Sequence, residues 1–241
     1  MERCAKRVST CGMLHYRKAP KVLPVLLDTL SGLLRSPPTP CDPDTVRVLQ
    51  GSTVLVTASH AVPHTRRAGP LAGPDRKKHD GATGQIAETI ALISGASALI
   101  VCTPWTGNAN ADPLDLCPFK QTMVAMIAGR EAHYVLDIHG MDARHNVDVC
   151  VGNGGTAPDA LTESLCGLLV KSGLSYSINK PFAARGAGTV RANASAAGAW
   201  ALQLEFAPHC RDPHRHPGPT GALLYALDRF VARLHDESAA T

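Results

Sequence analysis

The chain has 241 residues, a formal net charge of +4, 18% charged residues and 4% aromatic residues. This length suits one hydrophobic core, so we expect a single α/β domain over residues 1–241, with residues 1–20 peripheral or poorly ordered. The charge is mild and comes without a Lys/Arg run or interleaved aromatic residues, which argues against a nucleic-acid partner. No apolar stretch approaches the roughly 20 residues that span a bilayer, so we expect no membrane partner.

The cysteine pattern bears on the expected compartment. The eight cysteines are irregularly spaced and form no Cys-x-x-Cys pair. The N-terminal residues lack the apolar core and cleavage site of a secretory signal, so we expect reduced thiols and a cytoplasmic protein. Cys150 and Cys210 have histidines within a few residues, which leaves a cysteine nucleophile as an alternative.

Apolar periodicity predicts alternating helices and strands. Residues 21–34 have helical spacing, and strands at 46–49 and 53–57 are expected to form a hairpin or one interrupted strand. Residues 61–81 are expected to form a long loop, rich in Pro, Gly, Lys, Arg and His. The alternation indicates a mixed, largely parallel sheet flanked by helices. The remaining helices are expected at 83–94, 119–131, 159–171 and 221–235, and the remaining strands at 97–103, 135–139, 148–151, 176–179 and 200–206.

Three of the predicted strands run into a polar side chain. His60 follows one apolar run, His139 ends a second, and Glu205 lies near the end of a third. Because ligands of open α/β sheets bind beyond the carboxyl ends of the strands, we expect these side chains to converge. Histidine nitrogen and carboxylate oxygen are the usual donors of a catalytic zinc site, which keeps one position open for water.

Two acidic residues compete for the place of the carboxylate ligand. Asp80 and Glu88 are the candidates, although Asp80 could instead cap the following helix and Glu88 could lie on a solvated helix face. Glu205 would then be the base that takes a proton from water and donates it to the leaving amine. His64, four residues after His60, is a competing nitrogen ligand.

Five short motifs occur in an order that resembles the N-formylglutamate amidohydrolase family. That family belongs to a larger group with zinc carboxypeptidases and phage poly-γ-glutamate hydrolases. The resemblance covers residues 50–210 and implies a zinc-carboxypeptidase-like (phosphorylase/hydrolase-like) α/β fold. The motifs are Thr-Ala-Ser-His-Ala (57–61), Asp-Gly-Ala-Thr (80–83), Leu-Asp-Ile-His-Gly (136–140), Asn-Lys-Pro-Phe (179–182) and Leu-Gln-Leu-Glu (202–205).

The resemblance also implies a metal-dependent hydrolase of carbon–nitrogen bonds, with Zn²⁺ as its cofactor. One departure is that zinc carboxypeptidases carry His-x-x-Glu, whereas Pro63 stands three residues after His60 here. The matching positions give His60, Asp80 and His139 as zinc ligands, Glu205 as the general acid/base and Asp137 as a supporting residue.

Arginines in loops beside the predicted strand ends are candidates for binding a substrate carboxylate, because a guanidinium fork binds it through two hydrogen bonds. Arg144 and Arg185 are the preferred pair, with Arg144 also expected to polarise the scissile carbonyl as a catalytic residue. Arg66 and Asn179 complete the expected substrate-binding set, and Arg191 is a further candidate.

The leading hypothesis is a zinc-dependent amidohydrolase that cleaves an amide next to a carboxylate, as in an N-acyl amino acid, N-formylglutamate or a γ-glutamyl peptide. The long basic loop 61–81 motivates an alternative, a hydrolase for a peptide or a biosynthetic intermediate. The non-standard carboxylate motivates another, a non-catalytic binding protein on the same scaffold. The expected partner is a small anionic amide or peptide. The histidines at 209, 214 and 216 are interpreted as the rim of a flexible loop that could bind metal adventitiously.

Overall fold

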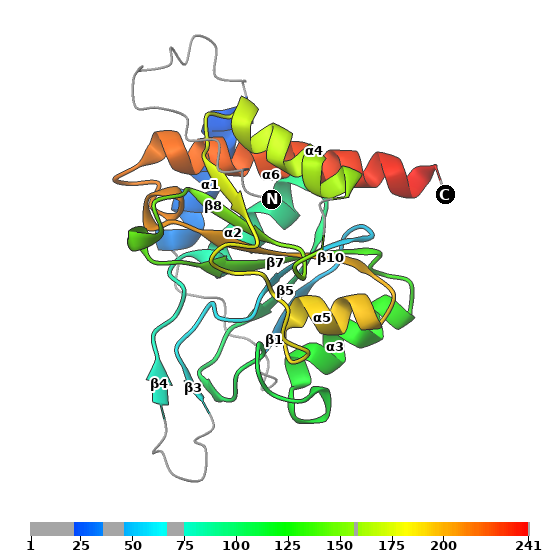
Figure 1. The fold of residues 1–241 in the computed structure, drawn as a ribbon. Coiled ribbons are helices and arrows are strands. Elements are labelled where there is room, and N and C mark those ends of the chain that lie inside the picture. The colour runs from blue at the N-terminus through cyan, green and yellow to red at the C-terminus, as the bar shows by residue number, and fades with distance from the viewer. Residues whose placement is uncertain (1–21, 36–45, 67–74, 157–158, 241) are drawn as a thin grey trace, which may run out of the picture.

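A seven-stranded mixed sheet forms the centre of the structure, a computed structural model that describes residues 22–35, 46–66, 75–156 and 159–240 (Figure 1). Four of its neighbouring strand pairs are parallel, whereas β1 with β5 and β10 with β8 are antiparallel. The predicted mixed, largely parallel α/β fold is therefore confirmed. In spatial order the strands are β1 (Val46–Leu49), β5 (Ser97–Val101), β2 (Val54–Ala58), β7 (Tyr134–Gly140), β10 (Trp200–Phe206), β8 (Val149–Gly152) and β9 (Tyr176–Ile178).

Helices cover both faces of this sheet (Figure 1). On the upper face in the figure lie α1 (Val22–Arg35), α2 (Thr83–Ser94), α4 (Ala160–Lys171) and α6 (Pro217–Ala239). The lower face carries α3 (Pro118–Ala128) and the short α5 (Val190–Ala196).

The strand period of two decides which face receives the polar side chains. In β7, Leu136 and Ile138 belong to the core under the upper helices, and Val135 belongs to the smaller core beside α3 and α5. Asp137 and His139 therefore share the face of Val135. By the same alternation, Leu204 packs in the upper core and Glu205 faces the same side as His139.

The predicted pairing of the first two strands is wrong. β5 lies between β1 and β2 and pairs with both, antiparallel to β1 and parallel to β2, so they form neither a hairpin nor one strand. All five residues of β2 are buried. A strand that is buried along its whole length lies inside a sheet and has a partner on each side. The short segment between β1 and β2 did not indicate that a later strand, β5, would lie between them.

The segment predicted as a long loop contains two short strands. β3 (His64–Arg66) pairs with β4 (Asp75–Lys77) and with β6 (Trp105–Thr106), forming a three-stranded sheet that extends below the main body (Figure 1). The strands β3, β4 and β6 and helix α5 had not been predicted. Their sequences are short and polar or Ala-rich, without the periodicity that marks a longer element.

Several other expectations have mixed outcomes. Cys102 is disulfide-bonded, so the expectation that every thiol is reduced is wrong, although Cys117, Cys150, Cys166 and Cys210 are free. The cytoplasmic location and the single-domain boundary stay predictions, and residues 1–20 lie outside the described residues. Within the described ranges, no helix combines the length and apolarity needed to cross a bilayer.

Candidate metal centre

Three side chains expected to bind a metal come together at the carboxyl edge of the central strands. The Nδ1 atom of His139 lies 3.2 Å from Oδ2 of Asp80, and Nδ1 of His60 lies 3.6 Å from the same oxygen. One nitrogen or oxygen from each of these residues lies within 4.8 Å of the others. The two imidazole centroids are 4.9 Å apart, so segments distant in sequence do bring these rings together.

The backbone fixes the position of Asp80 between the two histidines. Its amide donates a 2.9 Å hydrogen bond to the carbonyl of His60, while its carboxylate accepts one from the amide of Gly140. Asp80 does not cap α2, because the N-cap position is Ala82, in a left-handed conformation with φ 64°. Glu88 is half-buried in α2 and is not part of the group. The geometry therefore favours Asp80 over Glu88 as the carboxylate.

The outer nitrogens of both rings face hydrogen-bond acceptors. Nε2 of His139 lies 2.8 Å from a carboxylate oxygen of Asp137, and Nε2 of His60 lies 3.2 Å from Oδ1 of Asn108. With a proton on each Nε2, each Nδ1 faces Asp80 across a gap that either a second proton or a metal ion can fill. Two ring nitrogens and one carboxylate oxygen are a donor set that fits a divalent metal ion.

The buried carboxylate of Asp137 is held in place from the neighbouring strand. Its second oxygen accepts a 2.8 Å hydrogen bond from the hydroxyl of Thr57 in β2. A carboxylate that orients a ligand histidine in this way is a common supporting element of metal sites. This contact gives the supporting role expected for Asp137 a physical basis.

The charges of this group shift the pKa values of its members. Burial alone would raise the pKa of Asp80, but hydrogen bonds and positive charge from His139 and His60 hold it well below its ordinary value. Burial would likewise lower the pKa of His139, yet the carboxylates of Asp137 and Asp80 raise it well above the ordinary value. The group thus attracts positive charge strongly.

Glu205 lies beside this group on β10, where it is the register partner of His139 across the parallel β7–β10 pair. It is 7% exposed, and Nε2 of Gln203 donates a 2.8 Å hydrogen bond to its Oε1. Burial raises the pKa of Glu205, against the lowering effect of positive charge on His139. A carboxylate with a raised pKa close to the candidate ligands suits general acid/base chemistry.

His64 is placed beside the group. Its ring stacks on that of His60 with a centroid distance of 4.4 Å and an interplanar angle of 13°. The ligand atoms that converge come from His60, Asp80 and His139. The structure therefore favours His60 as the nitrogen ligand from this segment.

The predicted substrate-binding residues are placed less favourably. Arg144 is exposed on a short 3-10 helix (Ala143–His145), where its backbone amide bonds to Asp142. The side-chain amide of Asn179 is engaged with Asn153 and the Gly155 amide, so it holds that turn in place. The role of Asn179 in substrate binding stays a prediction. Arg66 lies in β3, and its role stays a prediction, as does the catalytic role of Arg144.

Two arginines lie against the glycine turn that follows β8. A Cβ atom on Gly155 would come within 1.9 Å of Nε of Arg185, and one on Gly154 within 2.2 Å of an Arg191 nitrogen. Nε of Arg191 is buried and has no hydrogen-bond partner in the part of the chain that the structure describes. The guanidinium groups of Arg185 and Arg191 thus lie against glycine backbone, and two neighbouring guanidinium groups suit the binding of an anion.

A loop that had been predicted only as irregular supplies further contacts to the centre. Asn108 contacts His60, and Nδ2 of Asn110 lies 3.1 Å from Nε2 of His139. Oδ1 of Asn110 accepts a hydrogen bond from the amide of Val190, the first residue of α5. Asn110 thereby connects the candidate centre to the segment that carries Arg191. No periodicity or motif in this loop pointed to these contacts.

A second group of possible ligands, Asp148, His209 and Cys210, has a structural explanation. One oxygen of Asp148 lies 2.6 Å from Nε2 of His209, and the other accepts bonds from the amide and hydroxyl of Ser175. Burial raises the pKa of the Cys210 thiol to about 12, so the thiolate needed by a metal is disfavoured. These residues join β8 to the segment after β10.

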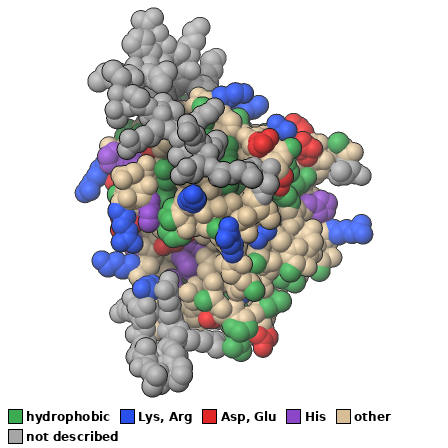
Figure 2. Space-filling model, viewed as in Figure 1, with side chains coloured by type: hydrophobic (Ala, Val, Ile, Leu, Met, Phe, Trp, Pro, Cys, Tyr) green, Lys and Arg blue, Asp and Glu red, His purple; other side chains and the backbone are tan. Residues whose placement is uncertain are grey.

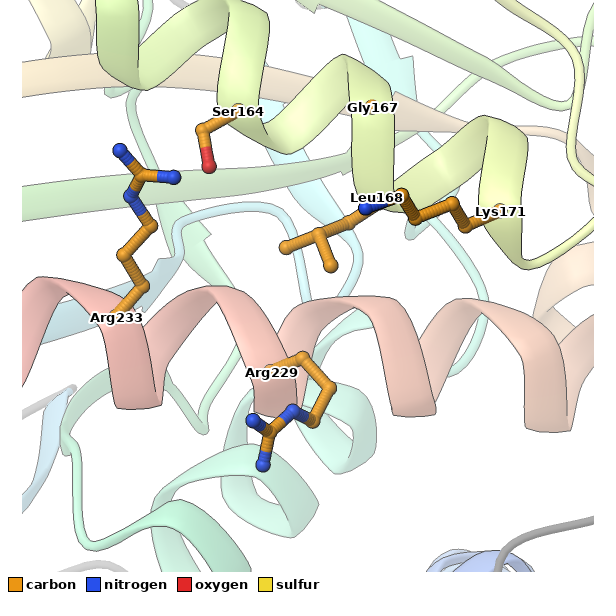
Figure 3. A pocket seen from close by; sticks show the side chains of 6 residues that line it. All are labelled: Ser164, Gly167, Leu168, Lys171, Arg229 and Arg233. Carbon is orange, nitrogen blue, oxygen red and sulfur yellow. The ribbon is translucent and has the colours of Figure 1, made fainter.

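Two cavities complete the description of the surface. One, of about 330 Å³, is lined by Pro63, His64, Thr65, Pro104, Trp105 and Thr106. It adjoins the candidate centre because His64 stacks on His60. The other, of about 300 Å³, lies between α4 and α6 on the upper side and is lined by Ser164, Gly167, Leu168, Lys171, Arg229 and Arg233 (Figure 3). Its lining contains none of the candidate ligands.

Known proteins share both sequence and fold features with the part of the chain that contains this centre. Residues 117–210 match the model of the N-formylglutamate amidohydrolase family. The resemblance expected from the sequence is thereby confirmed over the segment that contains Asp137, His139 and Glu205. No curated protein sequence matches the chain significantly.

Solved structures share the fold. The N-formylglutamate amidohydrolase from Ralstonia eutropha JMP134 is 12% identical with a TM-score of 0.55, and the match covers 80% of this chain and 98% of that one. A gene product of Agrobacterium tumefaciens is 14% identical with a TM-score of 0.57, covering 80% and 96%. These matches show a common fold. Together with the family match, they support the expected enzyme class, a hydrolase that acts on carbon–nitrogen bonds.

Proposed function

We propose that this protein is a zinc-dependent amidohydrolase that cleaves an amide bond adjacent to a carboxylate. The observation that carries the proposal is the pair of Nδ1 atoms directed at Asp80, with their Nε2 atoms held by Asp137 and Asn108. The match to the N-formylglutamate amidohydrolase family supports the choice of bond.

Each side chain of the centre has a distinct part in this proposal. His60, His139 and Asp80 hold the zinc ion, which when bound supplies a Lewis acid for the scissile carbonyl and for water. Glu205 accepts a proton from the attacking water and delivers it to the leaving nitrogen. Its burial keeps the pKa raised, against the lowering effect of the hydrogen bond from Gln203, and a raised pKa favours return of the proton. Asp137 keeps the ring of His139 oriented.

Arg191 and Arg185 are the groups that we propose to bind the substrate carboxylate. They pack on Gly154 and Gly155, where the glycines leave the guanidinium groups room to approach the backbone. Asn110 contacts both His139 and the amide of Val190, so it connects the helix that carries Arg191 to the proposed reaction centre. The proposal thus keeps Arg185 from the expected pair and takes Arg191, the further candidate, in place of Arg144, whose role stays a prediction. Histidines also lie among Lys and Arg side chains on the face shown in Figure 2, which suits an anionic substrate.

The cavity beside the centre favours a second candidate, a hydrolase for a peptide or for a larger acyl group. Pro63, Pro104 and Trp105 give this cavity an apolar wall, and Thr65 and Thr106 also line it. A volume of about 330 Å³ is sufficient for a group larger than formyl. In this case the same centre would act on a substrate whose acyl or peptide part lies against Trp105.

Metal analysis and substrate profiling test these proposals. The purified protein should contain about one zinc per chain, and the variant His139→Ala should contain none. Hydrolysis should be compared for N-formylglutamate, longer N-acylglutamates, a γ-glutamyl peptide, and the matching amides in which the carboxylate is a carboxamide. Efficient turnover of N-formylglutamate would reject the second candidate. Wild-type protein that binds no metal would overturn the proposed function.

A non-catalytic binding protein is the remaining outcome of the same experiments. It would bind the metal and the anionic ligand yet hydrolyse none of the compounds, and Glu205→Gln would not change ligand affinity. A large loss of turnover in this variant, with its metal content retained, would exclude that outcome.

A further inference from the structure

Arg211 lies next to the candidate centre and donates hydrogen bonds to the backbone of three separate segments. Its Nε atom donates a 3.0 Å hydrogen bond to the carbonyl of Phe206, the residue after Glu205. One terminal nitrogen donates to the carbonyls of Asp80 and Gly81 at 2.9 and 2.6 Å, and the other lies 3.3 Å from the carbonyl of Met141. One guanidinium thus joins the connection that carries Asp80 to the ends of the strands that carry His139 and Glu205.

The glycines that follow two of the candidate ligands provide the space for this guanidinium. A Cβ atom on Gly140 would lie 2.6 Å from Cζ of Arg211, and one on Gly81 would lie 3.1 Å from a terminal nitrogen. At the first distance, any side chain on residue 140 would force the guanidinium of Arg211 to shift. The glycines in the Asp80-Gly81 and His139-Gly140 pairs therefore form one packing unit with Arg211.

Two carboxylates of the candidate centre act on the charge of Arg211. Burial lowers the pKa of Arg211, while the negative charges of Asp80 and Glu205 oppose that shift. The side chain is partly buried, and its donors are directed at carbonyl oxygens of the protein. Because these hydrogen bonds run to backbone carbonyls, Arg211 acts through the backbone, so it is a positioning residue and not a catalytic one.

We propose that Arg211 sets the separation of the metal ligands and of Glu205 by fixing the ends of the three segments, an arrangement that we call the Arg211 clasp. The clasp consists of Arg211 with the carbonyls of Phe206, Asp80, Gly81 and Met141. This inference rests on the proposed function, because it concerns the geometry of the same centre. A lysine cannot reproduce it, since its single ammonium group cannot span three segments as a planar fork does.

Metal affinity is the main test of the clasp. We expect Arg211→Met to weaken zinc binding by about 10- to 100-fold in competition with a chromophoric chelator, as loss of other supporting contacts does. Arg211→Lys should recover only part of this loss. Gly140→Ala keeps the arginine but displaces its guanidinium, so it should reproduce the loss. Arg215→Met, which removes an exposed arginine from the same loop, is the matched control and should bind zinc as the wild type does.

A second measurement does not depend on the metal. The amide of Gly140 donates to the carboxylate of Asp80, so Arg211→Met should speed hydrogen exchange at this amide while amides in β5 exchange as before. Unchanged zinc affinity and unchanged exchange in a folded Arg211→Met variant would overturn the clasp. Failure of the proposed function would look different: the wild type would bind no zinc, while the exchange at Gly140 would still respond to Arg211. Faster exchange throughout β5 would show a general loss of stability and would also contradict the clasp.

Discussion

Glu205 and His139 are direct register partners on two adjacent parallel strands, β10 and β7. Because both side chains point to the same face, the pairing alone places a carboxylate beside a candidate ligand. A slip of one residue in this register would turn Glu205 to the opposite face, into the core under α6. The parallel ladder over seven residue pairs, from Trp200 with Tyr134 to Phe206 with Gly140, therefore fixes the base relative to the metal centre.

The first prediction concerns the stability of the metal-free protein. Burial raises the pKa of Glu205 in the folded protein above its ordinary value of 4.5. The free energy of unfolding therefore falls as the pH rises from 4.5 through the folded-state pKa, because the ionised carboxylate is less favourable in the fold than in water. Glu205→Gln should therefore melt at a higher temperature than the wild type at neutral pH and lose hydrolytic activity. The difference in melting temperature should disappear below pH 4.5, where the carboxyl is protonated in both states. Glu131→Gln, at an exposed position, serves as the control.

The second prediction concerns the orientation of His139. Asp137→Asn replaces the carboxylate that accepts from Nε2 of His139 by an amide. We expect zinc affinity to fall by about 10- to 100-fold without loss of the fold. Thr57→Val, which removes only the hydroxyl that holds Asp137, should have a smaller effect. Equal affinities in Asp137→Asn and wild type, measured by chelator competition, would contradict the assigned role.

The third prediction separates the two neighbouring histidines. His60→Ala should lose bound zinc, whereas His64→Ala should keep about one zinc per chain, because only His60 directs a nitrogen at Asp80. The stacked ring of His64 also lines the cavity next to Trp105, so its removal should alter the preference among acyl groups. The reverse pattern of metal content would show that His64 is the ligand.

The fourth prediction concerns recognition of the substrate carboxylate. Arg191→Met should lower kcat/KM for the carboxylate substrate by about tenfold to a hundredfold, the loss expected for hydrogen bonds to a charged group, ~1.5–3 kcal/mol. Zinc content should not change. The carboxamide analogue should be hydrolysed equally well by variant and wild type. An equal loss for both compounds would indicate a defect of the centre as a whole and not of carboxylate recognition.

The fifth prediction concerns a buried lysine outside the reaction centre. Lys120 is fully buried, and its ammonium donates to the carbonyls of Asp112 and Gly188. Lys120→Met leaves these buried carbonyls without their donor, so we expect a loss of about 1–3 kcal/mol in the free energy of unfolding per unsatisfied group. Denaturant titration measures this loss, and Lys171→Met on the exposed end of α4 is the control. Equal stabilities of the two variants would contradict the structural role.

The sequence was sufficient to predict the sheet class and the strand ends that carry His60, His139 and Glu205. Apolar runs mark buried strands, and the carboxyl ends of parallel strands lie at one edge, so the polar residues that follow them converge. Asp80 was one of two candidate carboxylates, with Glu88, until the family resemblance pointed to Asp80, and the structure places Asp80 between the two rings.

The contacts that come from loops could not be predicted in the same way. Asn108 and Asn110 reach the histidines from a segment without periodicity, and Arg211 reaches back to Asp80 across the chain. A single sequence shows what each segment prefers locally but not which segment lies next to it. The same limit explains the wrong hairpin, since nothing in residues 46–58 indicated that β5 would lie between the two strands.

The order of the strands along the chain also determines when the candidate site is completed during synthesis. β7 lies between β2, which leads to His60, and β10, which carries Glu205 near the C-terminal end of the chain. A nascent polypeptide that has emerged only as far as β8 already contains His60, Asp80 and His139 but not Glu205. Under the proposed function, hydrolysis must therefore await the synthesis of β10.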